Sequence, residues 1–292
     1  ASQSLFTLSL PEGGVDYMNL GASLRAGLAM DLVTQASGIS SINETMTEFD
    51  GITSQTSETA TSTGTVTLGQ DGLSMTGRTS DAQLTYNAPD MVPFPMSFSM
   101  ASAEGALTAP LLAMGGTQPA RLLFSVGGLD IDPQLVRLLD PSELLPREPI
   151  SMALDLSAEV RLLSDLVDFV TMGQLIETGT PPATVDSVTL DRLSVSAAGA
   201  DIDASGSFLL DFDDMTSFDG FPRPEGQASA RATGVNGLLD TLVAMGLLGD
   251  SDVMAARMGL GMFTRNMGDD MLESSLEVTP DGQVLVNGNR MR

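Results

Sequence analysis

The stretch TVTLGQDGLSMTG, residues 65–77, contains two runs of alternating polar and apolar side chains on either side of Gly69-Gln70-Asp71-Gly72. Alternation with a period of two is the pattern of a half-buried β-strand, because successive side chains of a strand point to opposite faces. An Asp-Gly dipeptide between two such runs is typical of a β-hairpin. The stretch therefore predicts two antiparallel strands that share one apolar face.

The same alternation recurs along the chain. It predicts a mainly β protein with a few helices, built as one long antiparallel meander in a single elongated domain over residues 1–292. Asp281-Gly282 and Asn287-Gly288 predict a closing hairpin at residues 273–290. A sheet of this kind keeps one apolar face, which must be covered. Beyond residues 65–77, strands are expected at residues 4–10, 82–86, 96–100, 120–127, 150–156, 160–163, 185–190, 193–197, 201–212, 273–278 and 283–286.

Helical periodicity is clearest near the C-terminus. Residues 235–248 and 251–264 carry apolar side chains at helical spacing, with Asn236 and Ser251 as the expected N-caps. The short join between them predicts an antiparallel helix pair, residues 235–264, that packs on the sheet and covers its apolar face. A shorter helix is expected at residues 133–139, where Asp132 would be the N-cap.

The side chains of this helix pair are candidates for a binding site. The chain has 18 methionines, several of which lie in or just after the pair. Flexible thioethers fit irregular apolar ligands, although they also fill ordinary cores between a helix and a sheet. Both interpretations stay open from the sequence. The candidate ligand-binding residues are Leu242, Met245, Met254, Met258 and Met262.

Two segments have ambiguous patterns. Residues 53–65 are rich in Ser and Thr with few apolar side chains, which favours a flexible loop or a solvated edge strand. Residues 20–33 are denser in Leu, Met and Ala and fit either a strand or a short helix.

The residue types that are missing exclude most enzyme chemistry. The chain has no Cys, His or Trp, and all 13 of its basic residues are Arg. Catalytic triads, thiolate nucleophiles, lysine Schiff bases and nitrogen- or sulfur-ligated metal sites are therefore excluded. A glycosidase that works with two carboxylates stays possible, but the chain is only 4% aromatic and would lack platforms for sugars. We expect a protein that is not an enzyme and uses no cofactor.

The net charge and the hydropathy pattern limit the classes of binding partner that the chain can have. The net charge of −25 repels nucleic acid, and the acids are scattered, as on a solvated surface. Alternating carboxylates at residues 130–132, 201–203 and 211–214 could attract Ca²⁺, but none has the spacing of an EF-hand loop, so no metal site is expected. The chain contains no uninterrupted run of 18 apolar residues, which is about the length that a membrane-spanning helix needs. The first residues, Ala1-Ser2-Gln3-Ser4, do not resemble a signal peptide and are compatible with a mature or trimmed product.

Several short signatures, in order, resemble a protein family. They are Asp140-Pro141 followed by Leu145-Pro146-Arg147-Glu148-Pro149, then Phe221-Pro222-Arg223-Pro224-Glu225-Gly226, then Gly234-Val235-Asn236-Gly237, and finally Asp281-Gly282 with Asn287-Gly288. Together they resemble a secreted alphaproteobacterial envelope family of unknown function, with a distant likeness to AsmA-like lipid-handling proteins. The resemblance covers the chain from about residue 64 onward. It implies a periplasmic location and a long, curved sheet with an apolar groove.

Two hypotheses about function follow. In the first, the protein is a non-catalytic periplasmic envelope protein that binds lipid or another apolar ligand in a β-groove. In the second, it is a structural or accessory subunit of an envelope or surface complex that acts through contacts with a partner protein.

Overall fold

The computed structural model describes residues 1–46, 52–89 and 92–291. Its 14 strands form one open antiparallel sheet, and the prediction of a mainly β meander is confirmed. The strands are β1 (Ser2–Ser9), β2 (Ala29–Met46), β3 (Ile52–Gly69), β4 (Gly72–Asn87), β5 (Met96–Ala109), β6 (Thr117–Ile131), β7 (Ile150–Leu162), β8 (Ala183–Ala197), β9 (Ala200–Asp211), β10 (Arg223–Thr233), β11 (Arg265–Gly268), β12 (Met271–Val278), β13 (Val284–Val286) and β14 (Asn289–Arg290). The helices are α1 (Leu20–Arg25), α2 (Pro133–Leu139), α3 (Phe169–Thr178), α4 (Val235–Ala244) and α5 (Asp250–Phe263).

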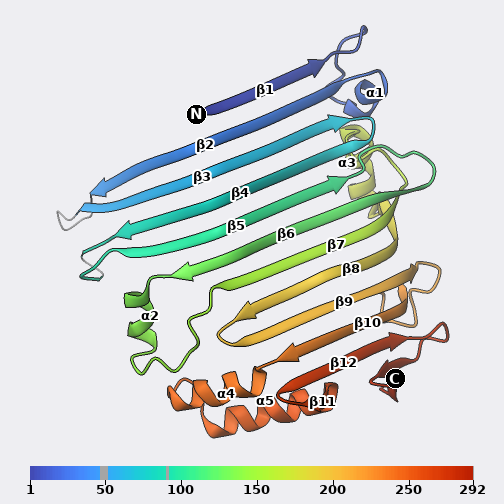
Figure 1. The fold of residues 1–292 in the computed structure, drawn as a ribbon. Helices are drawn as coiled ribbons and strands as arrows, with labels where there is room; N and C mark the ends of the chain where they lie inside the picture. Colours follow the sequence, from blue (N-terminus) through green and yellow to red (C-terminus); the bar gives the residue numbers. More distant parts are fainter. Residues whose placement is uncertain (47–51, 90–91, 292) are drawn as a thin grey trace.

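From β1 to β10, strands that are neighbours in the chain are also neighbours in the sheet. The order runs from β1 to β10 without a crossover and continues through β12, β13 and β14, while β11 pairs with β12 (Figure 1). The hairpin predicted from residues 65–77 is the β3–β4 turn, where Leu68 pairs with Leu73 and Gly69 with Gly72. Each strand therefore finds its partner locally, and no long connection has to cross the sheet.

The sheet is a single layer with both faces largely in contact with solvent. The accessible surface of the chain is 17512 Å². A compact monomer of 30.4 kDa would expose about 12,000 Å², so this chain exposes roughly half as much again. Few side chains are buried, and the largest fully buried ones are Leu24, Leu112 and Asp140. The protein therefore has small packed clusters and no central core layer.

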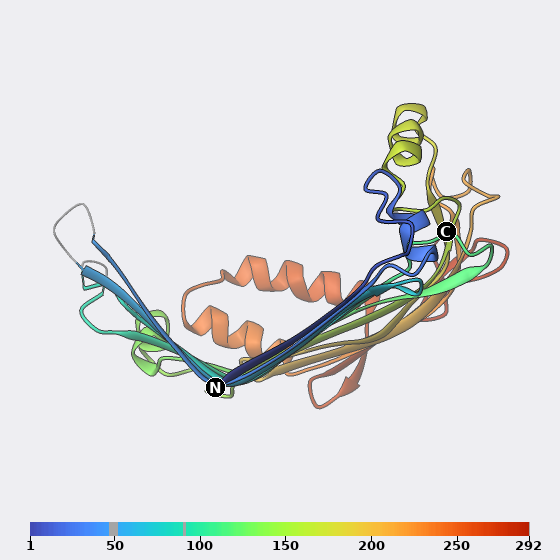
Figure 2. The ribbon, with the colours of Figure 1, turned by 90° about the horizontal axis from the view of Figure 1, so that it is seen from above.

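A sharp bend turns the sheet into a trough (Figure 2). The N-terminus lies beside this bend in the figure, and Ala1 bonds to the backbone of Ser37. The neighbouring Gly38, together with Asp81 and Gly128, has a positive φ of 60°, 49° and 67°, respectively. The register places Gly38 and Asp81 opposite the same residue of β3, and Gly128 lies against Ala101 on β5. A line of left-handed backbone across β2–β6 thus coincides with the bend.

The helices lie at the margins of the sheet. Figure 2 shows α4 and α5 side by side on the concave side, and Figure 1 places them along the edge formed by the last strands. Helix α4 contacts β9, and α5 packs on α4. The predicted helix pair exists, but it covers only this end and leaves the trough uncovered over the earlier strands. Helices α1 and α3 lie together at one end of the strands.

Two predictions about helix caps were wrong. The N-cap of α4 is Gly234 rather than Asn236, and the N-cap of α5 is Gly249 rather than Ser251. Asn236 instead binds the carboxylate of Asp270, which also accepts the backbone N–H groups of Asn236 and Gly237. A carboxylate from the following hairpin thus takes the place of a local cap.

The prediction of a loop or edge strand at residues 53–65 was also wrong. These residues form part of β3, which pairs with β2 on one side and β4 on the other. Hydroxyl groups bond across these strands, with Ser41 2.8 Å from Ser57 and Thr61 2.6 Å from Ser80. Backbone pairing on both sides stabilises the segment, although it has few apolar side chains. The sequence analysis also missed α3, which Asp168 caps through the backbone N–H of Thr171.

Two glycines with the same backbone conformation provide a test of the fold. Gly234 has φ 74° and lies where an added Cβ would be 2.1 Å from the carbonyl oxygen of Gly199, whereas Gly246 has φ 73° and open space around it. We expect Gly234→Ala to lower the free energy of unfolding by about 3 kcal/mol or more, because it adds a backbone clash to the conformational strain. Gly246→Ala is the matched control and should cost only about 1–2 kcal/mol. Equal losses in urea unfolding would contradict the close approach of α4 to the β8–β9 turn.

Candidate functional site: the apolar concave face

One row of apolar residues crosses the sheet from its first strand to its last strands. Directly paired residues of antiparallel strands point to the same face, so the register defines this central row. It contains no charged or hydroxyl side chain. Its members are Phe6, Leu32, Val66, Met75, Leu107, Leu122, Leu156, Leu190, Gly206, Ala228, Leu276 and Val286.

The neighbouring row, one residue along each strand, points to the other face and is polar. Ion pairs also link neighbouring strands on this face, such as Arg78–Glu104 at 2.9 Å and Arg231–Glu273 at 2.6 Å. The polar row consists of Thr7, Asp31, Thr67, Ser74, Thr108, Arg121, Ser157, Thr189, Ser207, Gln227 and Glu277.

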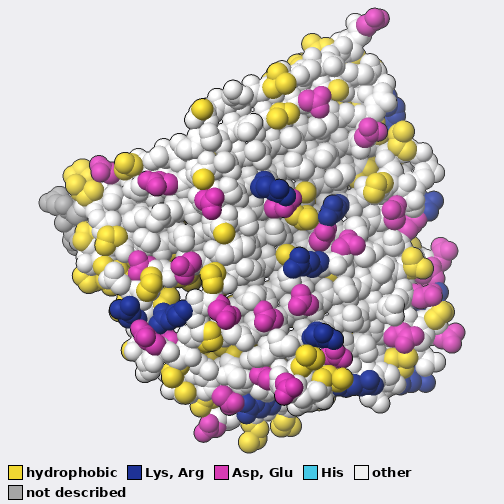
Figure 3. Space-filling view, viewed as in Figure 1, with side chains coloured by type: hydrophobic (Ala, Val, Ile, Leu, Met, Phe, Trp, Pro, Cys, Tyr) yellow, Lys and Arg dark blue, Asp and Glu magenta, His cyan; other side chains and the backbone are white. Residues whose placement is uncertain are grey.

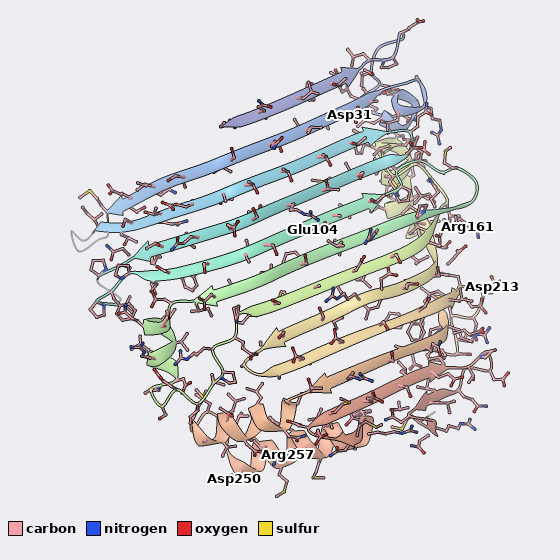
Figure 4. All side chains as sticks on the ribbon, in the orientation of Figure 1. Asp31, Glu104, Arg161, Asp213, Asp250 and Arg257 are labelled. Carbon is pink, nitrogen blue, oxygen red and sulfur yellow. The ribbon has the colours of Figure 1, made fainter. Side chains whose placement is uncertain are left out.

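The apolar face is the concave one. Figure 3 shows the face that is turned to the viewer in Figure 1, and charged side chains are spread over it. Figure 4 labels Glu104 near the middle of the sheet and Arg161 near one end, both members of ion pairs between strands. Seen from above in Figure 2, this face is the outside of the bend, while α3, α4 and α5 lie on the inside. The central row therefore lines the inside of the trough.

The inside of the trough is open to solvent over the middle strands. Leu122 and Phe124 on β6 are 45% and 47% exposed, although a sheet inside a protein would bury both. A shallow hollow of about 430 Å³ lies here, and its lining includes Leu32, Val66, Met75 and Leu107. Aligned apolar side chains of neighbouring strands are therefore left uncovered here.

Glycines form part of the floor of this hollow. Gly64 pairs with Gly77, Gly77 with Gly105, and Gly105 with Phe124, so three glycines lie side by side next to the central row. A Cβ at Gly77 would meet nothing within 4 Å, and one at Gly105 would meet only the carbonyl oxygen of Leu123 at 3.9 Å. The missing side chains therefore leave space that an apolar occupant could fill.

An ion pair joins α1 to the segment before α3 at one end of the strands. The guanidinium of Arg25, in α1, binds both carboxylate oxygens of Asp165, and Asp165 also accepts the backbone N–H of Ala113 at 2.8 Å. These bonds, above all the one from Arg25, hold the pKa of Asp165 below its usual range. Nearby, Asn19 donates to Asp168 at 3.1 Å. This end is therefore fixed by paired polar groups.

A buried carboxylate fixes the connector at the other end of the strands. Asp140 accepts the backbone N–H groups of Leu144 and Leu145 at 3.0 and 2.8 Å. These hydrogen bonds, the one from Leu144 first, lower the pKa of Asp140. Arg147, further along the connector, has its guanidinium 3.9 Å from the carboxylate of Glu143.

The signature residues of the sequence resemblance have structural roles. Asp140 closes its own loop, and Pro146 packs where a side chain at Gly199 would stand. Arg223 pairs with Asp211 at 2.7 Å. Buried Asn287 accepts the backbone N–H of Ser275 and donates to the carbonyl of Phe263, both at 2.9 Å. These residues maintain the meander and none of them lines the hollow.

The predicted ligand-binding residues lie on the helix pair, away from this hollow. Met254, Met258 and Met262 form a stripe along α5 and are 66%, 67% and 65% exposed. The first two line a groove between α4 and α5 together with Val243 and Val253. Leu242 and Met245 are half-buried on or beside α4. The methionine stripe of α5 is therefore not core filling, and its role in binding stays a prediction.

Sequence reasoning missed the residues of the central row as a site. The signal was the alternation itself, because apolar residues of predicted strands, such as Val66, Met75 and Leu122, belong to the row. What was missing was the register, which aligns Met75 with Leu107 and Leu107 with Leu122. Knowledge of which face stays uncovered was also needed.

Two other features bear on function. Within residues 1–46, 52–89 and 92–291, no group of three or more carboxylates is arranged to hold a metal ion. In the same part of the chain, none of the helices has the length and apolar character needed to cross a membrane.

Comparisons with known proteins identify no relative of this chain. No protein-family model matches the chain, and neither curated proteins nor solved structures give a match. The likeness to an envelope family therefore stays a prediction from the signatures.

The lowered pKa values of the structural carboxylates predict sensitivity to acid. Asp140, Asp165 and Asp214 all have lowered pKa values, and the hydroxyl and backbone N–H of Ser217 help to lower that of Asp214 to about 2. The unfolded chain then binds protons more readily than the folded one, so stability is complete above about pH 4 and is lost as the pH falls toward 2. Urea unfolding midpoints at pH 7, 4, 3 and 2.5 would measure this loss.

A serine variant isolates one of these groups. Ser217→Ala removes the largest contribution to the low pKa of Asp214, so we expect a shallower loss of stability between pH 4 and 2 than in the unmodified protein. Ser99→Ala, at an exposed position in β5, is the control and should leave the slope unchanged. An unchanged slope in Ser217→Ala would show that Asp214 does not contribute in this way.

Proposed function

We propose that this protein is a non-catalytic binding protein whose concave face holds the acyl chains of lipids. The observation that carries the proposal is the uncovered central row, which runs along the inside of a trough rather than across a flat face. Area burial alone would drive binding, at roughly 25 cal/mol per Å² of apolar surface. No reacting group is required.

The shape and chemistry of the trough support a chain-like apolar ligand. The row is continuous from Phe6 on β1 to Val286 on β13 and is interrupted by no charge. A concave strip of this kind can contact an acyl chain along its length, whereas polar headgroups would remain at the margin in water. The exposed area, about half as much again as a compact monomer shows, supports the proposal because such a surface is stabilised when an apolar ligand covers it.

The periplasmic location forms part of the proposal and depends on the sequence resemblance. Handling of lipids in the envelope would require a protein that shields acyl chains from water. The net charge of −25 would keep such a protein soluble and away from anionic headgroups except along its apolar trough.

Filling the floor of the trough tests the proposal. Gly105→Phe places a ring in the hollow without a backbone clash, because a Cβ there meets only an atom at 3.9 Å. Displacing three or four methylenes from the surface at about 0.8 kcal/mol each would weaken binding of a fluorescent fatty acid roughly 50- to 200-fold. Fluorescence titration would measure the Kd.

The matched control carries the same ring on the other face. Ala106→Phe, the next residue of β5, points to the convex side and should leave the Kd unchanged. Mass spectrometry of the native protein should also detect co-purified lipid, and less of it in Gly105→Phe. Equal affinities in the two variants, or no lipid and no uptake of the fatty acid, would rule out the trough as a lipid site.

A second candidate function is that of an accessory subunit that binds a partner protein. The observation that favours it is an exposed apolar cluster at the end that carries α1 and α3, formed by Tyr17, Met18, Phe169, Val170 and Ile176. None of these residues lines the hollow over the middle strands, so Ile176→Ser should weaken capture of an envelope partner while leaving fatty-acid binding intact.

A further inference from the structure

We propose that β1 pairs with β1 of a second copy of this chain, so that two sheets join edge to edge around a two-fold axis. The central row of apolar side chains would then continue from one copy into the other. This inference does not depend on what the trough binds.

Among the described strands, only β2 pairs with β1, so the outer side of β1 has no partner strand there. Strand β1 pairs with β2 through eight consecutive residues in regular register, and no other described strand pairs with it. Natural edge strands are usually protected by charges, proline, bulges or a covering element. Residues 2–9 read SQSLFTLS and contain no charge and no proline, and no shift of register interrupts them. All eight residues are exposed.

The opposite edge is protected. Strand β12 is covered on its outer side by the short β11 at one half and by β13 at the other. Strands β13 and β14 have only three and two residues, and the α4–α5 pair lies along the same edge (Figure 1). Edge-to-edge association can therefore use β1 alone, which limits the assembly to a closed pair.

The hydrogen-bonding phase of β1 suits pairing with itself. Ala1 and Ser37 exchange both backbone bonds, so Ala1 is turned toward β2. In an antiparallel ladder this orientation alternates, so the backbone groups of Ser4, Phe6 and Leu8 point outward. Two antiparallel copies bring such residues opposite one another, because each copy offers the same outward donors and acceptors at the same spacing.

The side chains continue the same pattern across the proposed axis. Phe6 belongs to the central row, and Leu8 lies on the same face of the strand. Even-numbered residues then pair with even-numbered residues, and a register with Phe6 opposite Phe6 or Leu8 of the other copy keeps these apolar side chains together on the concave face of both. The apolar row and the polar convex face would therefore each continue into the second copy.

The distribution of charge also favours this edge. The chain carries a net charge of −25, so most contacts between two copies would bring acids together. Strand β1 has none, and Asp31 is the only charged residue of β2 that lies opposite it. Figure 4 labels Asp31 near one end of this edge. Repulsion between copies is therefore weak at β1.

A proline substitution separates edge pairing from folding. Ser4→Pro removes an outward N–H that β2 does not use, so the sheet should persist while the pair of chains dissociates. We expect the unmodified protein to sediment at twice 30.4 kDa and Ser4→Pro as a monomer with an unchanged far-ultraviolet circular dichroism spectrum. Ser4→Ala keeps the N–H and should remain a dimer. A monomeric unmodified protein at about 100 μM, or a Ser4→Pro variant that remains dimeric, would overturn the proposal.

Cysteine cross-linking locates the interface independently of variant stability. The chain has no cysteine, so a single introduced thiol can only bond to its counterpart in another copy. Single cysteines at positions 4 to 8 should give a maximum of oxidative cross-linking at the residue nearest the two-fold axis. Thr76→Cys, on the convex side of β4, should give none. Equal cross-linking at all positions, or a dimer linked only through Thr76→Cys, would exclude β1 as the interface.

The two proposals can fail separately. Ser4→Pro should lower the mass of the assembly and leave Gly105 and Leu122 in place. Fatty-acid binding by a monomeric Ser4→Pro variant would therefore support the trough as a lipid site even without pairing. Conversely, a β1-linked dimer that takes up no fatty acid would retain the assembly and reject the ligand.

Discussion

An unbroken antiparallel ladder holds this chain together, because the described residues include no second layer that packs over the sheet. In most domains a sheet gains stability by burying one face against helices or against another sheet. Here backbone hydrogen bonds and cross-strand side-chain pairs supply what a core usually does, and packed clusters occur only at the margins. From β1 to β10, each strand pairs with the one before it in the chain.

The two faces of the sheet differ in polarity. The convex face satisfies its polar side chains with each other, as in the Arg78–Glu104 ion pair and the 2.5 Å contact between the hydroxyls of Thr65 and Thr76. Individual exposed pairs contribute little, typically below about 1 kcal/mol. Their effect is to keep this face well solvated. The concave face has no such pairing, and its uncovered apolar surface is the basis for the proposed binding of a ligand.

The parts of the fold that could be predicted from sequence are those set by local rules. The β3–β4 hairpin and the terminal hairpin follow from alternation and Asp-Gly turns, and α2 follows from Asp132, whose carboxylate accepts the N–H of Gln134 at 2.7 Å. Residues 53–65 could not be assigned in this way. Their Ser and Thr side chains look like those of a loop, and only pairing with β2 and β4 makes them a strand.

The candidate site was partly predictable for the same reason. Alternation identifies Met75 and Leu122 as members of an apolar face, but their alignment through Leu107 needs the register. The expectation that the helix pair covers this face came from the general need to bury it. Helix α5 instead keeps its methionines exposed, because α4 and α5 pack mainly on each other and on the edge near β9. The bend at Gly38, Asp81 and Gly128 could not be foreseen, since a positive φ at Asp81 has no clear signal in sequence.

A trough that is apolar inside and hydrated outside can bind an apolar ligand without catalytic groups. The sequence lacks Cys, His and Lys, three of the side chains that most often react with a ligand, and the apolar side chains of the central row would only contact one. A flat apolar face of the same area would favour contact with another flat surface, such as a second sheet. The bend changes this preference, because a narrow concave strip matches an occupant that is long, thin and apolar.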